Sequence, residues 1–506
     1  MAWSQRALHH LSGVVRPRKA FHSDGDGNRG YGRSRRWPEN PIRTLARPTF
    51  MNYVYFFVGW MAWTMDGYDF FTVSLSLSRL AEQYDRKRDQ ISTSITLTLL
   101  FRSVGAVIFG LAGDLYGRKW PMIVNLVIVA MLELATAFCT TYQQFLGVRS
   151  LFGIGMGGIW GLASSMALEN IPIESRGLFS GLLQQGYSLG YLLAAVFNIG
   201  VVPHSRHSWR LLFWIGAGLT TAVAIARAGF PESKQFLARK EEERRSGSKM
   251  TAKGKVQHFM KDLRQIFRTQ WRRMVYCVLL MTAFNALSHT SQDLYPTYMQ
   301  QTKLFSPHLS TVATIIGTVG ATVGGLIVGF LSQSLGRRFS ILLTCILGLA
   351  LLPLWILPSS FSLLALGAFW MQFMVQGAWG VVPIHLQELS PEGLRASFPG
   401  VVYQLGNMVA SACPQIASSI AESWTTKSKA GKTIPDYGRA QLVMMAVVWV
   451  LLAVVTVCGR ENRGKSFEEG AVAGPGRETA LVHEKGKGMD RTDSEADKSV
   501  EIRENV

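Results

Sequence analysis

The sequence is poor in charge and in cysteine. Only 17% of its 506 residues are charged, whereas soluble globular chains average about a quarter. The five cysteines form no C-x-x-C pair, so the sequence predicts neither a disulfide framework nor a metal site, and no cofactor is expected. The cysteines are Cys139, Cys277, Cys345, Cys413 and Cys458.

What the chain does contain is long apolar runs. Hydrophobic residues make up 48% of it and gather in blocks of about 20, the helix length that crosses ~30 Å of hydrocarbon. This pattern predicts an all-α polytopic membrane protein with twelve transmembrane helices in a lipid bilayer. The expected spans are 51–74, 92–113, 121–141, 145–167, 177–201, 209–230, 272–296, 310–333, 340–358, 361–386, 398–421 and 440–458.

The net charge of +19 follows the expected membrane topology. Arginine and lysine concentrate in the N-terminal tail, in 239–273 and in two short loops, and all of these lie in the cytosol if both termini do. Two outer loops, 86–88 and 427–432, also carry basic residues and run against this trend. We therefore expect both termini in the cytosol and no nucleic-acid partner.

The two tails differ from the rest of the chain in composition. The first 23 residues contain basic residues and no acid, which fits a mitochondrial presequence but also a basic cytosolic tail, the commoner companion of a permease. We expect disordered tails over 1–50 and 459–506, and a plasma-membrane protein. Ser494 lies among acidic residues as a candidate phosphorylation site, and the nearby lysines are candidates for ubiquitin- and arrestin-type regulation.

The second half of the chain repeats the first at a fixed separation. The segment 110–119 is matched by 329–338, which lies 219 residues further on. Such repeats predict a duplicated six-helix unit, 51–231 and 272–458, joined by a charged cytosolic loop at 232–271. Many secondary transporters are built in this way, with the substrate between the repeats. The same separation relates Trp160 to Trp379, Glu169 to Glu388, Pro172 to Pro391, Arg176 to Arg395 and Gln185 to Gln404.

The repeated loop resembles a motif of the major facilitator superfamily. The segment 110–119 matches its cytosolic loop, with Leu115 where a basic residue is usual, and the second copy has Gln333 in place of the aspartate. A fourth-span motif begins at Arg149, and the resemblance covers 50–467. It implies the major facilitator fold, in which these residues latch one conformation. The candidate gating residues are Gly110, Asp114, Gly117, Arg118, Arg149, Glu169, Arg176, Arg337, Glu388 and Arg395.

One motif is rejected. The segment 459–466 matches the phosphate-loop pattern G-x-x-x-x-G-K-S, but that loop needs a strand before it and a helix after it. Here a membrane span precedes the motif and a polar tail follows. No Ser-His-Asp or metal-ligand constellation occurs in a consistent setting elsewhere, so we do not expect an enzyme.

Few ionisable residues remain inside the spans. Arg102 lies about two turns before Gly110 in an apolar helix, and a buried cation needs an anion. That anion is either a protein carboxylate, Asp66 or Asp69, or a bound substrate, and the two can alternate. Because a guanidinium pairs bidentately with a carboxylate, Arg102 favours an anionic substrate.

A second set of polar residues recurs every four positions in the seventh span. Asn285, His289 and Asp293 lie on one face of a helix, at the depth where Asp66 lies in the first half. Histidine titrates near neutrality and burial favours a protonated carboxyl, so His289 and Asp293 are candidate proton carriers.

This stretch also resembles a family signature. Asn285-x-x-Ser-His289-x-Ser-Gln292-Asp293-x-x-x-Thr297 is similar, position for position, to that of the fungal Jen family of lactate/pyruvate–proton symporters. The resemblance also implies a role for Phe179 and Ser180 in setting substrate size. The implied substrate-binding residues are Arg102, Asn285, Gln292, Thr297, Gln404 and Asn407, and the candidate proton-coupling residues are His289, Asp293, Asp66 and Asp69.

The resulting expectation is import of a small monocarboxylate such as lactate, pyruvate or acetate with a proton, by alternating access. A dicarboxylate symporter for malate or succinate also fits the signature. A sugar facilitator leaves Arg102 unexplained. From a different class, a non-transporting carboxylate sensor would keep Arg102 but would not need His289 and Asp293.

Overall fold

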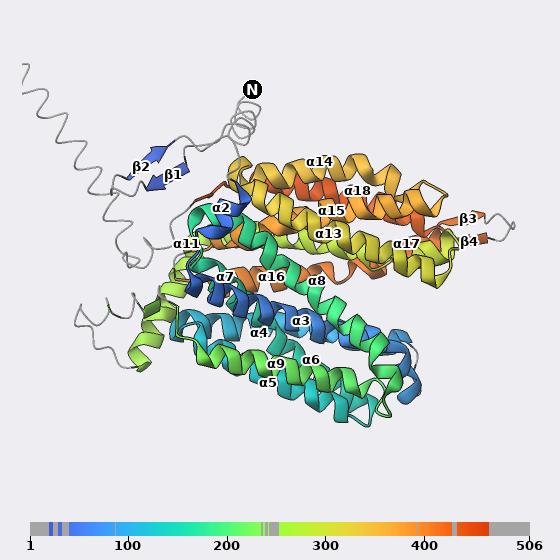
Figure 1. Cartoon of the computed structure of the whole chain (residues 1–506), viewed down its shortest axis with the longest axis horizontal. Coiled ribbons are helices and arrows are strands. Elements are labelled where there is room, and N and C mark those ends of the chain that lie inside the picture. Colours follow the sequence, from blue (N-terminus) through green and yellow to red (C-terminus); the bar gives the residue numbers. More distant parts are fainter. Residues whose placement is uncertain are drawn as a thin grey trace, which may run out of the picture.

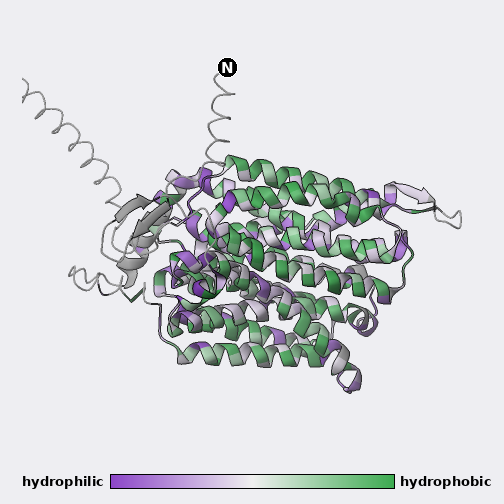
Figure 2. Cartoon of the chain, turned by 45° about the horizontal axis from the view of Figure 1, so that its top comes forward, coloured by the Kyte–Doolittle hydropathy of each residue, from purple (hydrophilic) through white to green (hydrophobic). Residues whose placement is uncertain are grey.

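The computed structural model describes residues 20–23, 29–32, 40–86, 88–233, 236–237, 241, 252–391, 393–427 and 433–464. The expectations for residues 1–19 and for 465–506, Ser494 included, lie outside the described residues. The described chain is a bundle of long helices lying side by side, with a short hairpin projecting from one end (Figure 1). Outer helix faces are apolar, and polar residues gather toward the two ends of the bundle (Figure 2).

The first half contains eight α-helices within the described residues, two of which form one broken span. Two short connecting turns are 3₁₀ helices, η1 (Ile173–Ser175) and η2 (Val202–His204). The α-helices are α2 (Pro41–Ala46), α3 (Phe50–Gln83), α4 (Arg88–Tyr116), α5 (Lys119–Phe138), α6 (Tyr142–Gly157), α7 (Ile159–Glu169), α8 (Arg176–Gly200) and α9 (Arg210–Gly229).

The second half repeats this order. A short π-helix, η3 (Tyr298–Thr302), follows the seventh span. The α-helices are α11 (Ala252–Gln292), α12 (Tyr295–Thr297), α13 (Pro307–Leu335), α14 (Arg337–Ile356), α15 (Phe361–Leu389), α16 (Ser397–Ala410), α17 (Cys413–Ser423) and α18 (Tyr437–Cys458).

Two antiparallel hairpins complete the described elements. β1 (Ala20–Ser23) pairs with β2 (Arg29–Gly32), and β3 (Thr425–Lys427) pairs with β4 (Thr433–Pro435), with Thr426 opposite Ile434. The β3–β4 hairpin marks one end of the bundle, which we call the hairpin end (Figure 1). The opposite end carries the turns between α4 and α5 and between α13 and α14, and we call it the motif end.

Every predicted span coincides with helix in the described chain. Nine helices there are long and apolar enough to cross a membrane. The other three predicted spans are α3, the later part of α11, and the pair α16–α17. The last is interrupted at Ser411–Ala412. Each of these three less apolar spans carries a candidate transport residue, Asp66, His289 or Gln404, whereas Arg102 lies in one of the nine apolar helices.

The structure differs from the sequence expectation at three places. Residues 41–46, expected within a disordered tail, form helix α2. The charged segment expected as a loop is helical from Ala252 and continues into the seventh span, with a break in helical geometry at Gln270. Lysine, arginine and glutamine favour helix, so the helix extends past the apolar region. The fourth span is divided into α6 and α7 at Gly158.

Contacts between the halves involve few helices. Helix α8 packs against α13 and α15, and α16 packs against α4 and α7. The repeat seen in the sequence also appears in space, because the ion pair between Arg118 and Glu169 is repeated by Arg337 and Glu388, each residue 219 positions later.

Candidate transport site

Arg102 lies near the middle of α4 and pairs with Asp66 of α3. Arg102 Nη2 is 2.6 Å from Asp66 Oδ2, and the side chains are 1% and 0% exposed. Of the two carboxylates considered from the sequence, Asp66 is the one that directly pairs with this cation. The pair has unused capacity, because Arg102 Nε and Asp66 Oδ1 have no hydrogen-bond partner among the described residues. A guanidinium with an unused donor can accommodate a second carboxylate.

Aromatic side chains from both halves lie around this pair. Tyr187 of α8 stacks on Trp63 with ring centroids 4.9 Å apart, and Tyr403 of α16 stacks on Trp160 with centroids 4.7 Å apart. Both phenols lie within electrostatic reach of the buried ion pair. Neither tyrosine has a role predicted from the sequence, because an isolated aromatic residue in a span is ordinary helix packing. Their rings exclude water, and charge interactions are stronger where water is excluded.

His289 is held between two oxygen atoms near the end of α11. Its Nδ1 lies 2.9 Å from Asp293 Oδ2, and its Nε2 lies 3.3 Å from Asn407 Oδ1 of α16. With the amide oriented this way both partners are acceptors, so a doubly protonated imidazolium satisfies both contacts. The His289 and Asp293 side chains are 20% and 41% exposed, so this pair is accessible where the Arg102 pair is not.

The amides of the family signature have different partners. Asn285 Nδ2 donates to the carbonyl of Met281 in its own helix, at 2.8 Å. Gln292 Nε2 donates to Gln372 Oε1 of α15, at 3.1 Å. Gln372 was not identified from the sequence, because no local pattern shows that α15 packs beside Gln292. Thr297 lies in α12, about two helical turns past His289.

Gln404 differs from these residues because neither polar atom of its side chain has a partner. It is 0% exposed, and both Oε1 and Nε2 lack hydrogen bonds among the described residues. The backbone carbonyl of Gln404 accepts from Ser103 Oγ at 3.3 Å, and Ser103 follows Arg102 in the chain. Buried amides are nearly always hydrogen-bonded, so this one is suited to a bound polar group.

A second buried charge cluster lies in the first half. Arg149 Nη1 is 2.9 Å from Glu133 Oε2, Thr72 Oγ1 donates to Glu133 Oε1 at 3.1 Å, and Thr220 Oγ1 donates to Asp69 Oδ2 at 3.1 Å. Glu133 thus pairs with the guanidinium, whereas Asp69 has only the threonine contact, and its Oδ1 has no hydrogen-bond partner among the described residues. Such a cluster can hold a proton, since an unpaired buried carboxylate is costly. Arg149, expected as a gating residue, therefore lies in this internal cluster.

At the motif end, Asp114 joins the two halves. Its carboxylate accepts from the backbone N–H groups of Ala396 and Ser397 at 2.9 Å each, and from Ser397 Oγ at 2.6 Å. Arg118 Nη2 lies 3.3 Å from Asp114 Oδ1 and 2.9 Å from Glu169 Oε1. Asp114 thus caps the start of α16 from the opposite half, where helix N–H groups lack partners.

This contact gives a first prediction. Asp114→Ala should leave the start of α16 uncapped and shift the population toward a motif end that is open, by about fivefold or more, because a cap contributes ~1 kcal/mol or more. The shift can be measured as faster maleimide labelling of a cysteine introduced at Ser164, which is buried between the halves. Ser397→Ala, which keeps the two backbone contacts, should have a smaller effect. Equal labelling in Asp114→Ala and the parent would contradict the latch.

The second half repeats the latch without the aspartate. Arg337 Nε and Nη2 each lie 3.1 Å from a different oxygen of Glu388, so the pair is bidentate. Gln333, which replaces the aspartate, accepts from Arg337 Nη2 at 2.8 Å and donates to the carbonyl of Ile173 in the other half, also at 2.8 Å.

Two further carboxylates complete these latches and were given no gating role from the sequence. Glu232 accepts from the backbone N–H groups of Arg118 and Lys119, at 3.1 and 2.9 Å. Glu461 accepts in the same way from the first two residues of α14, at 3.1 and 2.9 Å. Each lies just past the last span of its half, at the start of a charged segment. This position is the sequence signal that could have identified them.

The remaining gating candidates also lie at the motif end. A Cβ on Gly110 would come within 2.6 Å of Ser397 Cα, so only glycine allows this approach. Gly117 has φ of 97°, which favours glycine in the turn before α5. Arg176 Nε donates to the carbonyl of Ile171 at 3.1 Å, and Arg395 is buried in the turn before α16.

Glycines also bring α8 and α13 into close contact across the halves. A Cβ on Gly181 would lie 2.5 Å from the carbonyl oxygen of Gly325, and one on Gly177 would lie 2.7 Å from that of Gly329. Real Cβ atoms do not approach so closely, so this crossing requires glycine.

Ser180, between these glycines, is inserted into α15. Its hydroxyl donates to the carbonyl of Gly380 at 2.7 Å and accepts from the N–H of Ile384 at 3.1 Å, the two groups that an uninterrupted helix would pair with each other. Pro383, next to Ile384, has no N–H to donate. Its neighbour Phe179 packs against Phe56 of α3, with ring centroids 4.8 Å apart.

The model of the sugar (and other) transporter family matches residues 41–471. The chain belongs to this family. Among its relatives is the carboxylic acid transporter protein homolog of Saccharomyces cerevisiae, which is 35% identical over 434 residues, covering 84% of this chain and 70% of that protein. The sialic acid transporter NanX of Escherichia coli is 26% identical over 370 residues, covering 72% of this chain and 86% of that protein.

Solved structures confirm the predicted fold. The proton:xylose symporter XylE of the major facilitator superfamily, bound to 6-bromo-6-deoxy-D-glucose, matches with a TM-score of 0.61 and 17% identity, covering 83% of this chain and 98% of that one. The expected major facilitator fold is therefore confirmed, and this family member is a membrane transporter rather than an enzyme.

Proposed function

We propose that this transporter imports small monocarboxylates together with a proton across the plasma membrane. The observation that carries the proposal is the buried Arg102–Asp66 pair, whose guanidinium has an unused donor. The name of the yeast relative, a carboxylic acid transporter homolog, supports the same substrate class. Gln404 and Asn407 of α16 are proposed to complete the substrate pocket with Asn285, Gln292 and Thr297.

Charge balance accounts for the proton. If a substrate carboxylate takes the place of Asp66 on Arg102, the displaced Asp66 becomes an unpaired buried carboxylate. A proton on Asp66 removes that cost, because the site then holds one cation and one anion as before. One carboxylate therefore enters with one proton. The Asp69–Glu133–Arg149 cluster, with one carboxyl in excess, is proposed as a second place where a proton can reside.

The proposed orientation places the motif end in the cytosol. The basic residues Arg118, Lys119, Arg337 and Arg338 lie there, as the positive-inside rule asks. With Asp114 and Ser180 joining the halves at this end, the structure then corresponds to a state closed to the cytosol. His289 and Asp293, which are partly exposed, would receive the proton from outside.

The test is uptake of labelled lactate by permease-deficient yeast at acidic and neutral pH, with and without a proton uncoupler. Saturable uptake that is faster at acidic pH and lost with uncoupler would support the proposal. No uptake by protein that reaches the cell surface would contradict it and favour a carboxylate sensor.

A dicarboxylate substrate is the second candidate, because His289 offers a second cation when its ring is doubly protonated. Labelled malate or succinate separates the two candidates. Competition by succinate against lactate uptake would favour the wider substrate range.

Replacement of Asp293 by asparagine tests the proton pathway. We expect accumulation of lactate against its gradient to be lost, because the amide cannot carry a proton and His289 loses its carboxylate partner. Downhill exchange of lactate should persist, since the Arg102 pair is intact. Asp293→Glu, which keeps a titratable carboxyl, is the matched control, and normal accumulation in Asp293→Asn would rule out this role.

A further inference from the structure

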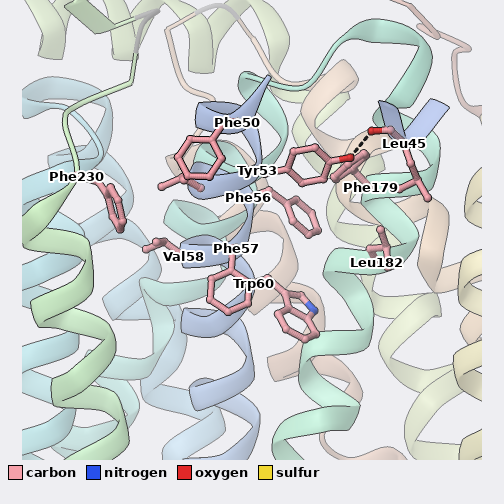
Figure 3. Close-up of a pocket in the computed structure, with 11 residues that line it drawn as sticks. Leu45, Phe50, Tyr53, Phe56, Phe57, Val58, Trp60, Phe179, Leu182 and Phe230 are labelled. Atoms are coloured by element: carbon pink, nitrogen blue, oxygen red, sulfur yellow. Dashed lines mark hydrogen bonds between the residues drawn. The ribbon is translucent and has the colours of Figure 1, made fainter. Parts of the chain in front are cut away.

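Two tyrosine hydroxyls near the Arg102 pair have no partner. Tyr53 shows the ordinary case, because its hydroxyl donates to the carbonyl of Leu45 at the edge of an apolar groove (Figure 3), and Tyr68 donates to a backbone carbonyl at 3.1 Å. Tyr403 is only 7% exposed and Tyr187 is half-buried, yet neither hydroxyl forms a hydrogen bond with the described residues. Since buried hydroxyls nearly always have a partner, these two are suited to a bound molecule.

Aromatic contacts place Tyr187 beside Arg102. Its ring stacks on Trp63, which lies one helical turn before Asp66 in α3. Phe70, one turn after Asp66, lies between the two: its ring centroid is 6.4 Å from that of Tyr187 and 6.0 Å from the guanidinium carbon of Arg102. One face of α3 therefore carries the aspartate and both rings that position Tyr187.

Tyr403 is held from the other half of the molecule. Its ring is stacked on Trp160 of α7 with 15° between the planes, and it meets Trp379 of α15 and Trp63 of α3 edge-on, with centroids 5.9 and 6.3 Å away. Rings from three helices thus fix its position, and its hydroxyl lies within electrostatic reach of Arg102.

The rings that hold the two tyrosines also carry unused donors. The side chains of Trp63 and Trp160 are each 1% exposed, and neither indole N–H has a partner among the described residues. Arg102 Nε is unpartnered as well. A carboxylate on the guanidinium leaves the phenol and indole donors unused, so a substrate with a further acceptor oxygen satisfies more of them.

Building on the proposed function, in which Arg102 binds the substrate carboxylate, we propose that Tyr187 and Tyr403 determine specificity by binding the oxygen on the second carbon of the substrate. That oxygen is carried by the carbon next to the carboxylate, so donors beside Arg102 can reach it. Hydroxyl and oxo oxygens both accept a hydrogen bond, so lactate and pyruvate match the site. Propionate has the same number of carbons but leaves both phenols unpartnered.

The experiment measures exchange of labelled lactate in proteoliposomes that contain the full-length protein and unlabelled lactate. External lactate, pyruvate and propionate compete at neutral pH, where all three are ionised. We expect pyruvate to inhibit as well as lactate does, and propionate to need at least about tenfold more, because a site built to hydrogen-bond an oxygen rejects the analogue that lacks it. Equal inhibition by propionate would overturn the specificity role while leaving carboxylate transport intact.

Exchange also separates this role from proton coupling. Because exchange needs no net proton movement, a protein whose lactate uptake ignores the proton gradient would contradict the proposed symport but would still show the preference for pyruvate. A protein that is incorporated and exchanges no lactate at all would overturn both.

Phenylalanine variants locate the preference. Tyr187→Phe and Tyr403→Phe keep the rings, and each should lower the preference for pyruvate over propionate by about fivefold, because one hydrogen bond is lost. Inhibition by propionate should stay the same, which a loosely packed protein would not show. Tyr191→Phe is the control, since Tyr191 lies one turn after Tyr187 and packs on Phe71. An unchanged preference in both variants, or equal weakening of all three acids, would overturn the proposal.

Discussion

Replacing Arg102 with glutamine is expected to abolish saturable carboxylate uptake, by more than about a hundredfold. Breaking a buried ion pair costs ~3–5 kcal/mol, and here the same group is proposed to bind the substrate anion. The contact with Asp66 is 2.6 Å long and Arg102 is 1% exposed, so the pair is shielded from bulk solvent. Initial rates of labelled lactate uptake, normalised to protein at the cell surface, measure the effect.

A second substitution separates substrate binding from folding. Arg102→Gln with Asp66→Asn removes both charges, so no unpaired carboxylate remains in the membrane. The double variant should recover cell-surface expression without recovering uptake. If the double variant transports lactate at the parent rate, Arg102 does not bind the carboxylate.

Gly181→Leu is expected to prevent closure of the motif end. Even a Cβ at this position would lie 2.5 Å from the carbonyl oxygen of Gly325, and leucine adds three more carbons. Overpacking costs ~1–3 kcal/mol, which shifts a two-state population by about 5- to 150-fold. Because alternating access requires both states, transport should fall by a similar factor.

Spin labels at Trp120 and Leu335, exposed residues of the two halves at the motif end, can report this shift as a longer distance. The exposed Cys458 is removed from the background first. Gly218→Leu is the control, since a Cβ at Gly218 meets no atom within 4 Å. An unchanged distance in Gly181→Leu would show that this crossing does not limit closure.

Much of the fold was predictable because its physical signals are local. Apolar runs gave the spans, and the separation of 219 residues gave the repeat that reappears in the Arg118–Glu169 and Arg337–Glu388 pairs. The predicted boundaries were less accurate where a polar segment forms a helix outside the apolar span. The helix from Ala252 to Gln292 runs through charged sequence, because such residues are unfavourable in lipid but favourable in helix.

The candidate site was only partly predictable because its partners come from distant helices. Periodicity placed His289 and Asp293 on one face, and their 2.9 Å contact agrees with that. No local pattern identifies Tyr403 and Tyr187 as neighbours of the Arg102 pair, or Gln372 as the partner of Gln292. The roles given to these residues stay proposals for the uptake and labelling experiments.

The hydroxyl of Ser180, inserted into α15, gives a way to measure how often the motif end opens. While the halves are joined, the amide proton of Ile384 is held by a group that belongs to the other half of the molecule. When the motif end separates, that proton loses this partner and can exchange before the carbonyl of Gly380 takes it up. The rate at which this amide proton exchanges with deuterium therefore reports how often the motif end opens. One backbone position can thus measure the opening frequency without an attached label.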